Sequence, residues 1–339
     1  MKKSNFLRGF SYASLVLAAL TFASCSDDDK GPDSKSELED KYFSIENATY
    51  TESAMPEATS ASTIDGLTIN NQALSGGMNL ITIISQETYR KFFLGVEGIE
   101  GHYIYTPQTS DEMSGYHFYT IPVMYSTNYN KDITMAVSAE TAEGKITKTT
   151  KAPITFVESK TGALDIKLVF SNAKDIDLHL IMPSGREIYY GNRGGSVTLT
   201  DGSEISYGLD HDSNAGCYID NLNNENIYIP AELIENGTYT VKVNMYSNCD
   251  SSIPTSWSIV ARYKGELIRN ESGHNPASGV YPIGAGEGDH TEVMTFTITD
   301  GTIDLNNDRS TSHIKSTKTI KPSEMDLLKI DNDLFDQGF

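Results

Sequence analysis

The chain has 339 residues, of which 46 are acidic and 26 are basic, and its formal net charge is −20. Such an acidic balance argues against nucleic acid as a partner and against a basic grip on anionic lipid. The length is sufficient for two domains of ordinary size.

The first 24 residues, 1–24, have the three parts of a secretory signal peptide. Three basic residues and no acid precede an apolar run, 12–22, and small residues follow it directly before Cys25. The run is shorter than the roughly 20 apolar residues that a membrane-spanning helix needs. Small residues before a cysteine resemble the bacterial lipobox, which implies acylation of Cys25 and a lipid anchor in the membrane. The alternative is an ordinary signal peptide with an incidental cysteine.

Residues 25–41 form the next predicted segment, an acidic tether. The sequence SDDDK at 26–30 resembles the acidic export signal of Bacteroidetes lipoproteins, which implies an outer-membrane protein that faces outside the cell. The Pro, Gly, Ser and acidic residues that follow show no apolar periodicity, so we expect a flexible linker. Cleavage after residue 24 removes three basic residues, so 46 acidic residues remain against 23 basic ones, a formal charge of −23.

Strand signals dominate the rest of the chain. Short runs rich in Thr, Val, Ile, Tyr and Phe alternate with Gly, Asn, Asp and Pro, whereas helix signals are nearly absent. Runs at this spacing predict an all-β chain with two β-sandwich domains. The predicted strands include 80–84, 119–125, 133–138, 164–170, 175–182, 239–246, 257–263 and 292–299.

The first predicted sandwich spans 42–159. Apolar and polar residues alternate on both sides of Glu143 and Gly144, which predicts a hairpin with its turn at these residues. The pattern resembles the last two strands of an immunoglobulin-like or fibronectin type III module. We find no catalytic constellation here, because His102 and His117 are isolated in strand-rich sequence.

The second predicted sandwich spans 160–300, and a polar tail, 301–339, with signals for a short helix follows it. Trp257, the only tryptophan, alternates with an isoleucine and is expected in the core. Cys217 and Cys249 are the two cysteines that remain once Cys25 carries the lipid. In an oxidising compartment an even pair predicts a disulfide, and two free buried thiols are the alternative.

The stretch 175–185 departs from ordinary strand chemistry. Because strand side chains alternate between faces, Asp175, Asp177 and His179 are expected to share the face opposite the core. Carboxylates two residues apart on one face repel each other unless a cation or hydrogen-bond donors lie between them.

A second polar segment, 208–226, is rich in oxygen ligands. Asp210, Asp212 and Asn214 alternate as in a calcium loop, although the spacing and flanking helices of an EF-hand are absent. Calcium takes about six to eight oxygen ligands. The candidate carboxylate ligands are Asp175, Asp177, Asp210, Asp212 and Glu225, and the further polar candidates are His179, Asn214 and Asn226.

Other interpretations of these residues stay open. The aspartates could form turns within a purely hydrogen-bonded polar cluster. Zinc bound by His179 and His211 together with aspartates is a second alternative, and a catalytic carboxylate pair is a third. Tyr189, Tyr190 and Tyr207 lie near the polar loops, where they could stack on a sugar or serve as ordinary strand formers.

The order of these motifs resembles the YfaP-type domain of bacterial exported proteins. Over about 162–264 the chain contains Asp-x-Asp-Leu-His, Pro-x-Gly, Leu-Asp-x-Asp, Glu-Asn-Ile and Gly-Thr-Tyr-Thr-Val-Lys-Val in this order, with a longer insert at 194–206. The resemblance implies a β-sandwich and a polar motif, and no particular activity. The motif positions are Asp175, Asp177, His179, Asp210, Asp212, Glu225 and Asn226.

Together these patterns predict a surface lipoprotein that acts as a non-enzymatic binding or accessory module. The expected ligand is a glycan or a protein at the cell surface, and the expected cofactor is calcium in a structural site. The alternatives are an extracellular hydrolase subunit or glycan-active enzyme, and a structural stalk of the envelope. No Gly-x-Ser-x-Gly elbow or fixed triad supports the enzyme.

Overall fold

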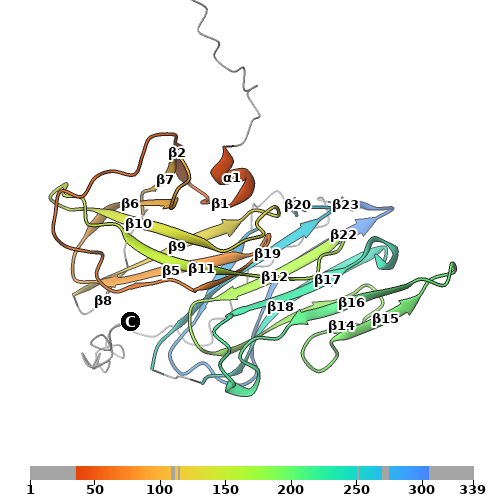
Figure 1. The fold of residues 1–339 in the computed structure, drawn as a ribbon. Helices are drawn as coiled ribbons and strands as arrows, with labels where there is room; N and C mark the ends of the chain where they lie inside the picture. The colour runs from red at the N-terminus through yellow and green to blue at the C-terminus, as the bar shows by residue number, and fades with distance from the viewer. Residues whose placement is uncertain (1–35, 108–110, 114, 250–251, 269–274, 305–339) are drawn as a thin grey trace, which may run out of the picture. The chain divides into compact units, whose positions relative to one another are not determined.

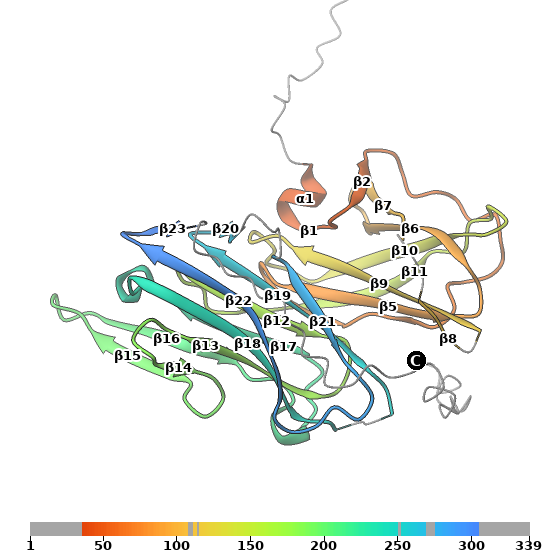
Figure 2. The same cartoon turned by 180° about the vertical axis from the view of Figure 1, so that it is seen from behind.

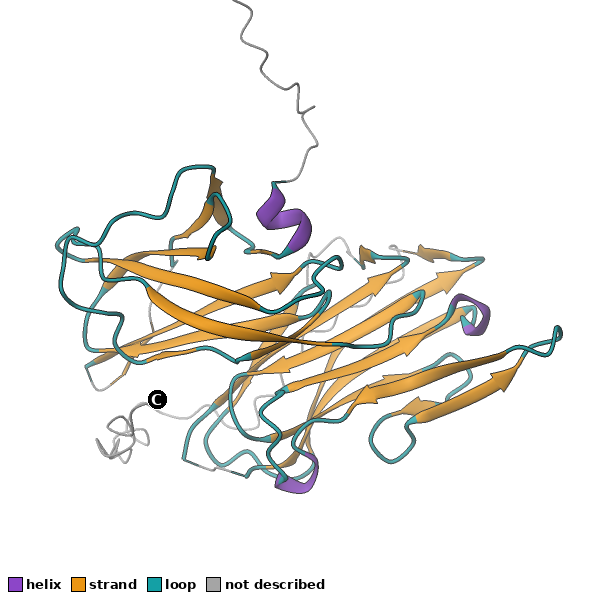
Figure 3. Cartoon of the chain, viewed as in Figure 1, coloured by secondary structure: helices purple, strands orange, loops and turns teal. Residues whose placement is uncertain are grey.

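The computed structural model describes residues 36–107, 111–113, 115–249, 252–268 and 275–304 (Figure 1). The predicted signal peptide, the predicted lipidation site Cys25, most of the tether and most of the polar tail lie outside these residues. The described elements are almost all strands, as the sequence predicted (Figure 3). No helix among them is long and apolar enough to cross a membrane.

The first sandwich is built from two sheets whose apolar faces pack together. One sheet has the order β1 (Phe43–Ser44), β9 (Tyr116–Tyr125), β5 (Met78–Ser85) and β3 (Leu67–Thr68), with β8 (Asp111–Met113) paired to β9. The other has the order β2 (Ala48–Thr51), β7 (His102–Tyr105), β6 (Tyr89–Val96), β10 (Ile133–Thr141), β11 (Thr150–Val157) and β4 (Gln72–Leu74). Alternation leaves one apolar face on each sheet, so Ile81, Leu94 and Val137 meet in one buried core.

β10 and β11 form the hairpin that the sequence predicted. They pair antiparallel from Ile133 opposite Ile154 to Val137 opposite Thr150. Gly144 has a φ of 77° at the turn, a conformation that glycine adopts without strain.

The described chain begins with α1 (Glu37–Lys41), inside the segment 25–41 for which the sequence predicted a tether. Ser36 caps this helix by accepting a hydrogen bond from the backbone N–H of Glu39 at 3.1 Å. Leu38 is fully buried in the core of the first sandwich. Burying a leucine side chain contributes roughly 1.5–3 kcal/mol, so the end of the predicted tether belongs to the folded domain.

The second sandwich also consists of two sheets, and Figure 2 shows its strands from behind. One sheet has the order β15 (Gly194–Thr198), β16 (Glu204–His211), β17 (Asn224–Ile229), β12 (Leu164–Phe170), β19 (Thr255–Tyr263) and β20 (Glu266–Leu267), with β21 (Ala277–Tyr281) paired to β19. The other has the order β14 (Glu187–Ile188), β13 (Asp175–Ile181), β18 (Gly237–Ser247), β22 (Asp289–Thr299) and β23 (Thr302–Asp304). Ile166 of β12 and Leu178 of β13 share its core with Trp257, which confirms the predicted burial of the tryptophan.

β23 lies at the start of the segment 301–339 for which the sequence predicted a polar tail. Asp300 and Gly301 have positive φ values of 48° and 75°, which suit the tight turn of a two-residue hairpin. Thr302 therefore pairs with Thr299, and the last sheet extends beyond residue 300. The Asp-Gly dipeptide was the sequence signal for this hairpin.

The two sandwiches contact each other within one compact unit. β5 of the first packs on β12 and β19 of the second through a small apolar cluster of Met78, Leu80, Val169 and Val260. This apolar contact joins the two sandwiches directly.

The loop between β16 and β17, residues 212–223, leads to the candidate site. It contains η1 (Ala215–Cys217), and the second short 3-10 helix, η2 (Ala231–Leu233), follows β17 (Figure 3). A disulfide joins Cys217 to Cys249, which lies just after β18. The loop starts from one sheet of the second sandwich, so the disulfide ties it to the end of a strand in the other sheet.

Candidate metal centre

β13 places two of the predicted carboxylates. Asp175 and Asp177 alternate with core side chains along this strand, as the sequence predicted. Both aspartates are nevertheless only 1 % exposed. The loop 212–223 covers them, and the N–H of Gly216 donates a hydrogen bond to Oδ2 of Asp175 at 2.6 Å. The outer face of β13 is therefore shielded from solvent along the first half of the strand.

Glu225 reaches the same place from the other sheet. It lies opposite Leu168 in the pairing of β17 with β12, so its side chain projects between the two sheets. Its Oε2 accepts a hydrogen bond at 2.6 Å from the N–H of Leu178, on a part of β13 that β14 leaves unpaired. Its Oε1 accepts one from the N–H of Ser213 at 3.3 Å. This single side chain connects β17, β13 and the loop.

Three carboxylates meet at this point. Asp177, Asp212 and Glu225 each offer one oxygen, and these oxygens all lie within 4.8 Å of one another. In the described part of the chain no other group of three His, Cys, Asp or Glu side chains has such geometry. Oδ2 of Asp177 and Oδ1 of Asp212 are buried without a hydrogen-bond partner. Buried carboxylate oxygens without donors are unfavourable unless the carboxylates are protonated or a cation binds them, so this group could hold a metal ion.

Burial and mutual repulsion disfavour the ionised forms of these carboxyl groups. Burial first, and then the charges of Asp175 and Asp212, raise the pKa of Asp177 to about 8. The pKa of Glu225 is well above its usual range, first through burial and then through the charge of Asp177. Burial also raises the pKa of Asp175 to about 6. A bound cation would offset this repulsion by stabilising the ionised carboxylates.

Arg193 approaches the group from the solvent side. Its Nη1 lies 3.4 Å from Oδ2 of Asp212, and its side chain is half exposed. An exposed pair of this kind contributes little to stability. The arginine therefore does little to offset the repulsion between the ionised carboxylates.

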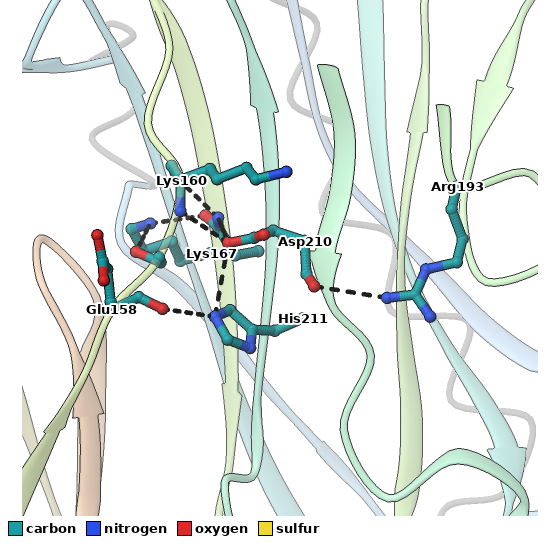
Figure 4. A network of polar contacts seen from close by, with 8 residues as sticks. Glu158, Lys160, Lys167, Arg193, Asp210 and His211 are labelled. Atoms are coloured by element: carbon teal, nitrogen blue, oxygen red, sulfur yellow. Dashed lines mark hydrogen bonds and ion pairs between the residues drawn. The ribbon is translucent and has the colours of Figure 1, made fainter. Parts of the chain in front are cut away.

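Asp210 lies outside this group, in a second polar network (Figure 4), which Arg193 links to Asp212 through the carbonyl of Asp210. A β-bulge between Leu209 and His211 breaks the alternation of β16. Oδ2 of Asp210 accepts a hydrogen bond from the N–H of Lys160 at 2.7 Å and lies 3.5 Å from Nε2 of His211. The alternating spacing of Asp210 and Asp212 thus does not bring both aspartates to one site.

Asn226 belongs to the network of Asp210. Its Oδ1 accepts a hydrogen bond from Nζ of Lys167 at 2.6 Å, and its Nδ2 donates to the carbonyl of Lys160 at 2.9 Å. Burial lowers the pKa of Lys167 to about 8. The network fixes the segment that links the two sandwiches to β12 and β17.

Asn214 has a structural role in the loop. Its φ is 61°, and its Nδ2 donates to the carbonyl of Lys174 at 2.9 Å and to Oδ1 of Asn223 at 2.8 Å. Its Oδ1 accepts a hydrogen bond from the N–H of Asp220 at 3.0 Å. The side chain thereby stabilises the loop conformation that carries Asp212.

The two histidines of the zinc alternative have different partners. Nδ1 of His179 lies 2.9 Å from Oε1 of Glu187, and Nε2 of His211 lies 2.8 Å from the carbonyl oxygen of Glu158. Neither histidine joins the three-carboxylate group. The structure therefore does not assemble the proposed zinc ligands.

His179 belongs instead to an aromatic cluster, which we define as His179, Tyr189, Tyr190 and Tyr246. The imidazole stacks on Tyr189 with ring centroids 5.0 Å apart and an interplanar angle of 16°. Tyr190 packs edge-on against Tyr189 at 5.0 Å and against Tyr246 at 4.9 Å. Tyr207 lies outside the cluster, where its ring contacts a guanidinium group on the same sandwich.

Sequence reasoning missed Tyr246. The alternation of β18 was its signal, because Tyr246 shares the outer face of that strand with Asn244. Asn244 pairs with Asp177 across β13 and β18. The pairing of these strands, which the sequence alone does not reveal, brings Tyr246 to the aromatic cluster.

No protein-family model matches the chain, and the search of curated proteins finds no match. Among solved structures, a pullulanase complexed with maltotriose from Anoxybacillus sp. LM18-11 is 13% identical, with a TM-score of 0.17. This comparison covers 57% of the present chain and 25% of the pullulanase. SGBP-B of the Bacteroides ovatus mixed-linkage glucan utilization locus, in complex with a mixed-linkage heptasaccharide, is 15% identical with a TM-score of 0.19.

The comparison with SGBP-B covers 50% of the present chain and 49% of that protein. The chain thus spans a quarter of the pullulanase and about half of SGBP-B. At these TM-scores the similarities support no conclusion about ligand or activity.

Proposed function

We propose that this protein is exported, anchored by lipid on Cys25 to the outer membrane, and exposed at the cell surface as a non-enzymatic binding module. The signal-like segment 1–24 and the acidic residues after Cys25 support the export and the anchor. The resemblance of residues 162–264 to YfaP-type domains of bacterial exported proteins supports the export. The second sandwich, in this proposal, contains a calcium ion.

The observation that carries the calcium proposal is the group Asp177, Asp212 and Glu225, with two buried oxygens that lack donors. All ligand atoms in the group are carboxylate oxygens, which hard cations prefer, whereas zinc sites usually include His or Cys. Magnesium requires a near-ideal octahedron and keeps several waters, which a buried group of this kind does not favour. Calcium accepts irregular sets of six to eight oxygens, including bidentate carboxylates.

The ion would hold the loop 212–223 against β13. Asp212 belongs to the loop, Asp177 to β13 and Glu225 to β17, so one cation ties all three elements. The disulfide between Cys217 and Cys249 also connects the loop to the sheet that contains β13. A surface ordered in advance loses less conformational entropy when it binds a ligand.

Thermal unfolding of the chain from Ser26 to Phe339 tests the metal. After EDTA treatment, calcium at about 100 times its dissociation constant is expected to stabilise the fold by about 2.7 kcal/mol. For a folded unit of this size, that corresponds to a rise in Tm of about 4–5 °C. Magnesium at the same concentration is expected to give a smaller rise.

Asp177→Asn is expected to abolish the calcium response. Asp65→Asn is the matched control, because Asp65 is exposed and lies in the first sandwich. A wild-type Tm that calcium leaves unchanged, or an equal rise in Asp177→Asn, would contradict the calcium site.

The anchor is tested in cells that express the full chain. Wild-type protein is expected to incorporate labelled palmitate and to partition into detergent, and Cys25→Ala is expected to do neither. Protease added to intact cells should degrade the wild-type protein. Lack of labelling in the wild type would rule out the lipid anchor, and protection from protease would rule out surface exposure.

A further inference from the structure

The aromatic cluster lies on the outer face of the sheet that also carries Asp177. His179 follows Asp177 by two residues on β13 and lies opposite Lys242 of β18. Tyr246 lies two positions beyond Asn244 along the outer face of β18. The rings therefore stand beside the metal centre and above a row of polar side chains.

A tight turn presents the most exposed ring of the cluster. Tyr189 and Asn192 exchange backbone hydrogen bonds of 3.2 and 3.0 Å, and Tyr190 and Gly191 form the tip between them. A Cβ atom on Gly191 would lie 2.8 Å from the ring of Tyr189, so only glycine allows this ring to lie where it does. Tyr190 is 39% exposed at the tip.

The rings are held in place before any ligand binds. Tyr190 contacts Tyr189 on one side and Tyr246 on the other, and Tyr189 is stacked on His179. Nδ1 of His179 is hydrogen-bonded to Glu187, which fixes the orientation of the imidazole. Little rotamer entropy remains to be lost when a ligand packs on this cluster.

Polar side chains surround the cluster. Lys242 lies opposite both His179 and Glu292 in the sheet, and Asn244 lies opposite both Asp177 and His290. Glu292 and His290 are exposed. These side chains place hydrogen-bond donors and acceptors around the rings.

We propose that the aromatic cluster binds a neutral glycan, with a pyranose ring packed against Tyr190 and Tyr246 and its hydroxyl groups hydrogen-bonded to the polar side chains around them. The proposal rests on the binding function proposed above and names the ligand class of that module. The C–H groups on the face of a pyranose match the apolar face of a tyrosine ring, and its hydroxyl groups require nearby polar partners.

Charge selects a neutral ligand. Glu187 and Glu287 lie around the cluster: Glu187 is hydrogen-bonded to His179, and the charge of Glu287 acts on the phenol of Tyr190. The whole chain has a net charge of −20. Nucleic-acid bases also stack on aromatic rings, but phosphate groups, like sulfated or uronic-acid polymers, would be repelled here.

The small apolar area argues for a sugar over a protein partner. Stable protein interfaces bury about 1,200–2,000 Å² and are built around large apolar anchors. Among the exposed large hydrophobic residues of the described ranges, Tyr190 is the only one in the aromatic cluster. One exposed ring with polar neighbours matches the size of a single monosaccharide unit.

Affinity electrophoresis tests the proposal on the chain from Ser26 to Phe339. Native gels contain amylopectin, mixed-linkage β-glucan, arabinoxylan or galactomannan as neutral probes, and polygalacturonate as the anionic probe. At least one neutral polysaccharide is expected to retard the wild-type protein. Tyr190→Ala is expected to weaken binding at least tenfold, whereas Tyr190→Phe, which keeps the ring, stays within threefold of the wild type.

Two further variants complete the test. Tyr218→Ala is the control, because Tyr218 is 84% exposed and lies outside the cluster; it is expected to bind as the wild type does. Tyr246→Leu keeps apolar bulk without the ring and is expected to weaken binding independently of Tyr190. The Tm of each variant, with and without calcium, shows that the fold and the metal centre are intact.

The outcomes separate this inference from the calcium proposal. Calcium stabilisation without retardation by any neutral polysaccharide would overturn the glycan site and leave the metal centre standing. Retardation that depends on Tyr190 in a protein insensitive to calcium would support the glycan site and remove the metal. Retardation by polygalacturonate alone, or retardation that survives both Tyr190→Ala and Tyr246→Leu, would also overturn the glycan site.

Discussion

Asp177→Asn is expected to stabilise the protein without calcium and to eliminate its response to calcium. In the metal-free protein Asp177 is buried, its Oδ2 has no partner, and its pKa is raised from 3.8 to about 8. At pH 7 the folded protein therefore retains a proton that the unfolded chain has released. The difference between pH 7 and 3.8 is about three pH units, which at about 1.4 kcal/mol per unit destabilises the fold by up to about 4 kcal/mol.

Asparagine removes this destabilisation because it does not ionise. Its amide also places an N–H donor beside the carboxylates of Asp212 and Glu225, each of which has an oxygen within 4.8 Å of one of Asp177. We therefore expect the free energy of unfolding in EDTA at pH 7 to rise by on the order of 1–4 kcal/mol. With saturating calcium the wild type should gain stability, and the variant should not, because one of the three carboxylate ligands is lost.

Urea unfolding followed by the fluorescence of Trp257 measures both effects. This residue is the only tryptophan and is buried in the core of the second sandwich, so its signal reports on the domain that contains Asp177. Asp65→Asn again serves as the control for the same chemical change at an exposed position. A variant that is less stable than the wild type in EDTA, and that still responds fully to calcium, would refute the reasoning.

Three further predictions concern the same sandwich. The pKa values of Asp175 and Asp177 are raised in the folded state, so the free energy of unfolding in EDTA should fall as the pH rises from about 4 to 8; a flat urea-unfolding profile over this range would contradict it. Replacing Cys217 and Cys249 by serine should lower stability by about 3–4 kcal/mol, because the bridge closes a loop with a sequence separation of 32 residues; an unchanged melting temperature would show that the bridge does not constrain the unfolded chain. Gly191→Ala should displace the ring of Tyr189 and weaken glycan binding severalfold in affinity electrophoresis, and equal binding by the variant would show that this ring is not required.

The strands could be predicted because their signal is local. Short runs rich in Thr, Val, Ile, Tyr and Phe identified β5, β9, β10, β12, β13, β18, β19 and β22, and the alternation of side chains placed Asp175, Asp177 and His179 on one face of β13. The burial of the two aspartates was not predictable, because it depends on the path of a loop that begins in the other sheet. The alternation of side chains along a strand shows which face each one occupies, but it does not show which segment covers that face.

The composition of the carboxylate group was only partly accessible from the sequence. Asp177 and Glu225 are 48 positions apart and lie in different sheets, so their meeting depends on how the sheets stack. Asp210 was expected beside Asp212, but a one-residue bulge turns it into the network around Lys160. Bulges redirect side chains without a fixed sequence signature. Similarly, α1 was missed because a single buried leucine, Leu38, anchors it without a repeating pattern.

The metal centre and the aromatic cluster share one strand, so we expect them to be thermodynamically coupled. On β13, Asp177 would bind the ion, and the backbone N–H of Leu178 is hydrogen-bonded to Glu225. The next residue, His179, stacks on the ring of Tyr189. A cation bound by Asp177 and Glu225 would disfavour conformations in which β13 moves away from the loop, so a larger fraction of the calcium-bound protein should present the cluster as the structure has it. We therefore expect calcium to strengthen glycan binding by roughly fivefold or more, and the glycan to strengthen calcium binding by the same factor, because coupling between two sites is reciprocal.

Isothermal titration of the glycan in EDTA and in calcium measures one side of this coupling, and titration of calcium with and without the glycan measures the other. Tyr190→Ala should remove the effect of the glycan on calcium affinity while leaving calcium binding itself intact, since Tyr190 contributes no ligand to the ion. Glycan affinities that are equal in EDTA and in calcium would show that the two sites act independently. In that case the ion would stabilise the fold without preparing the ligand-binding face.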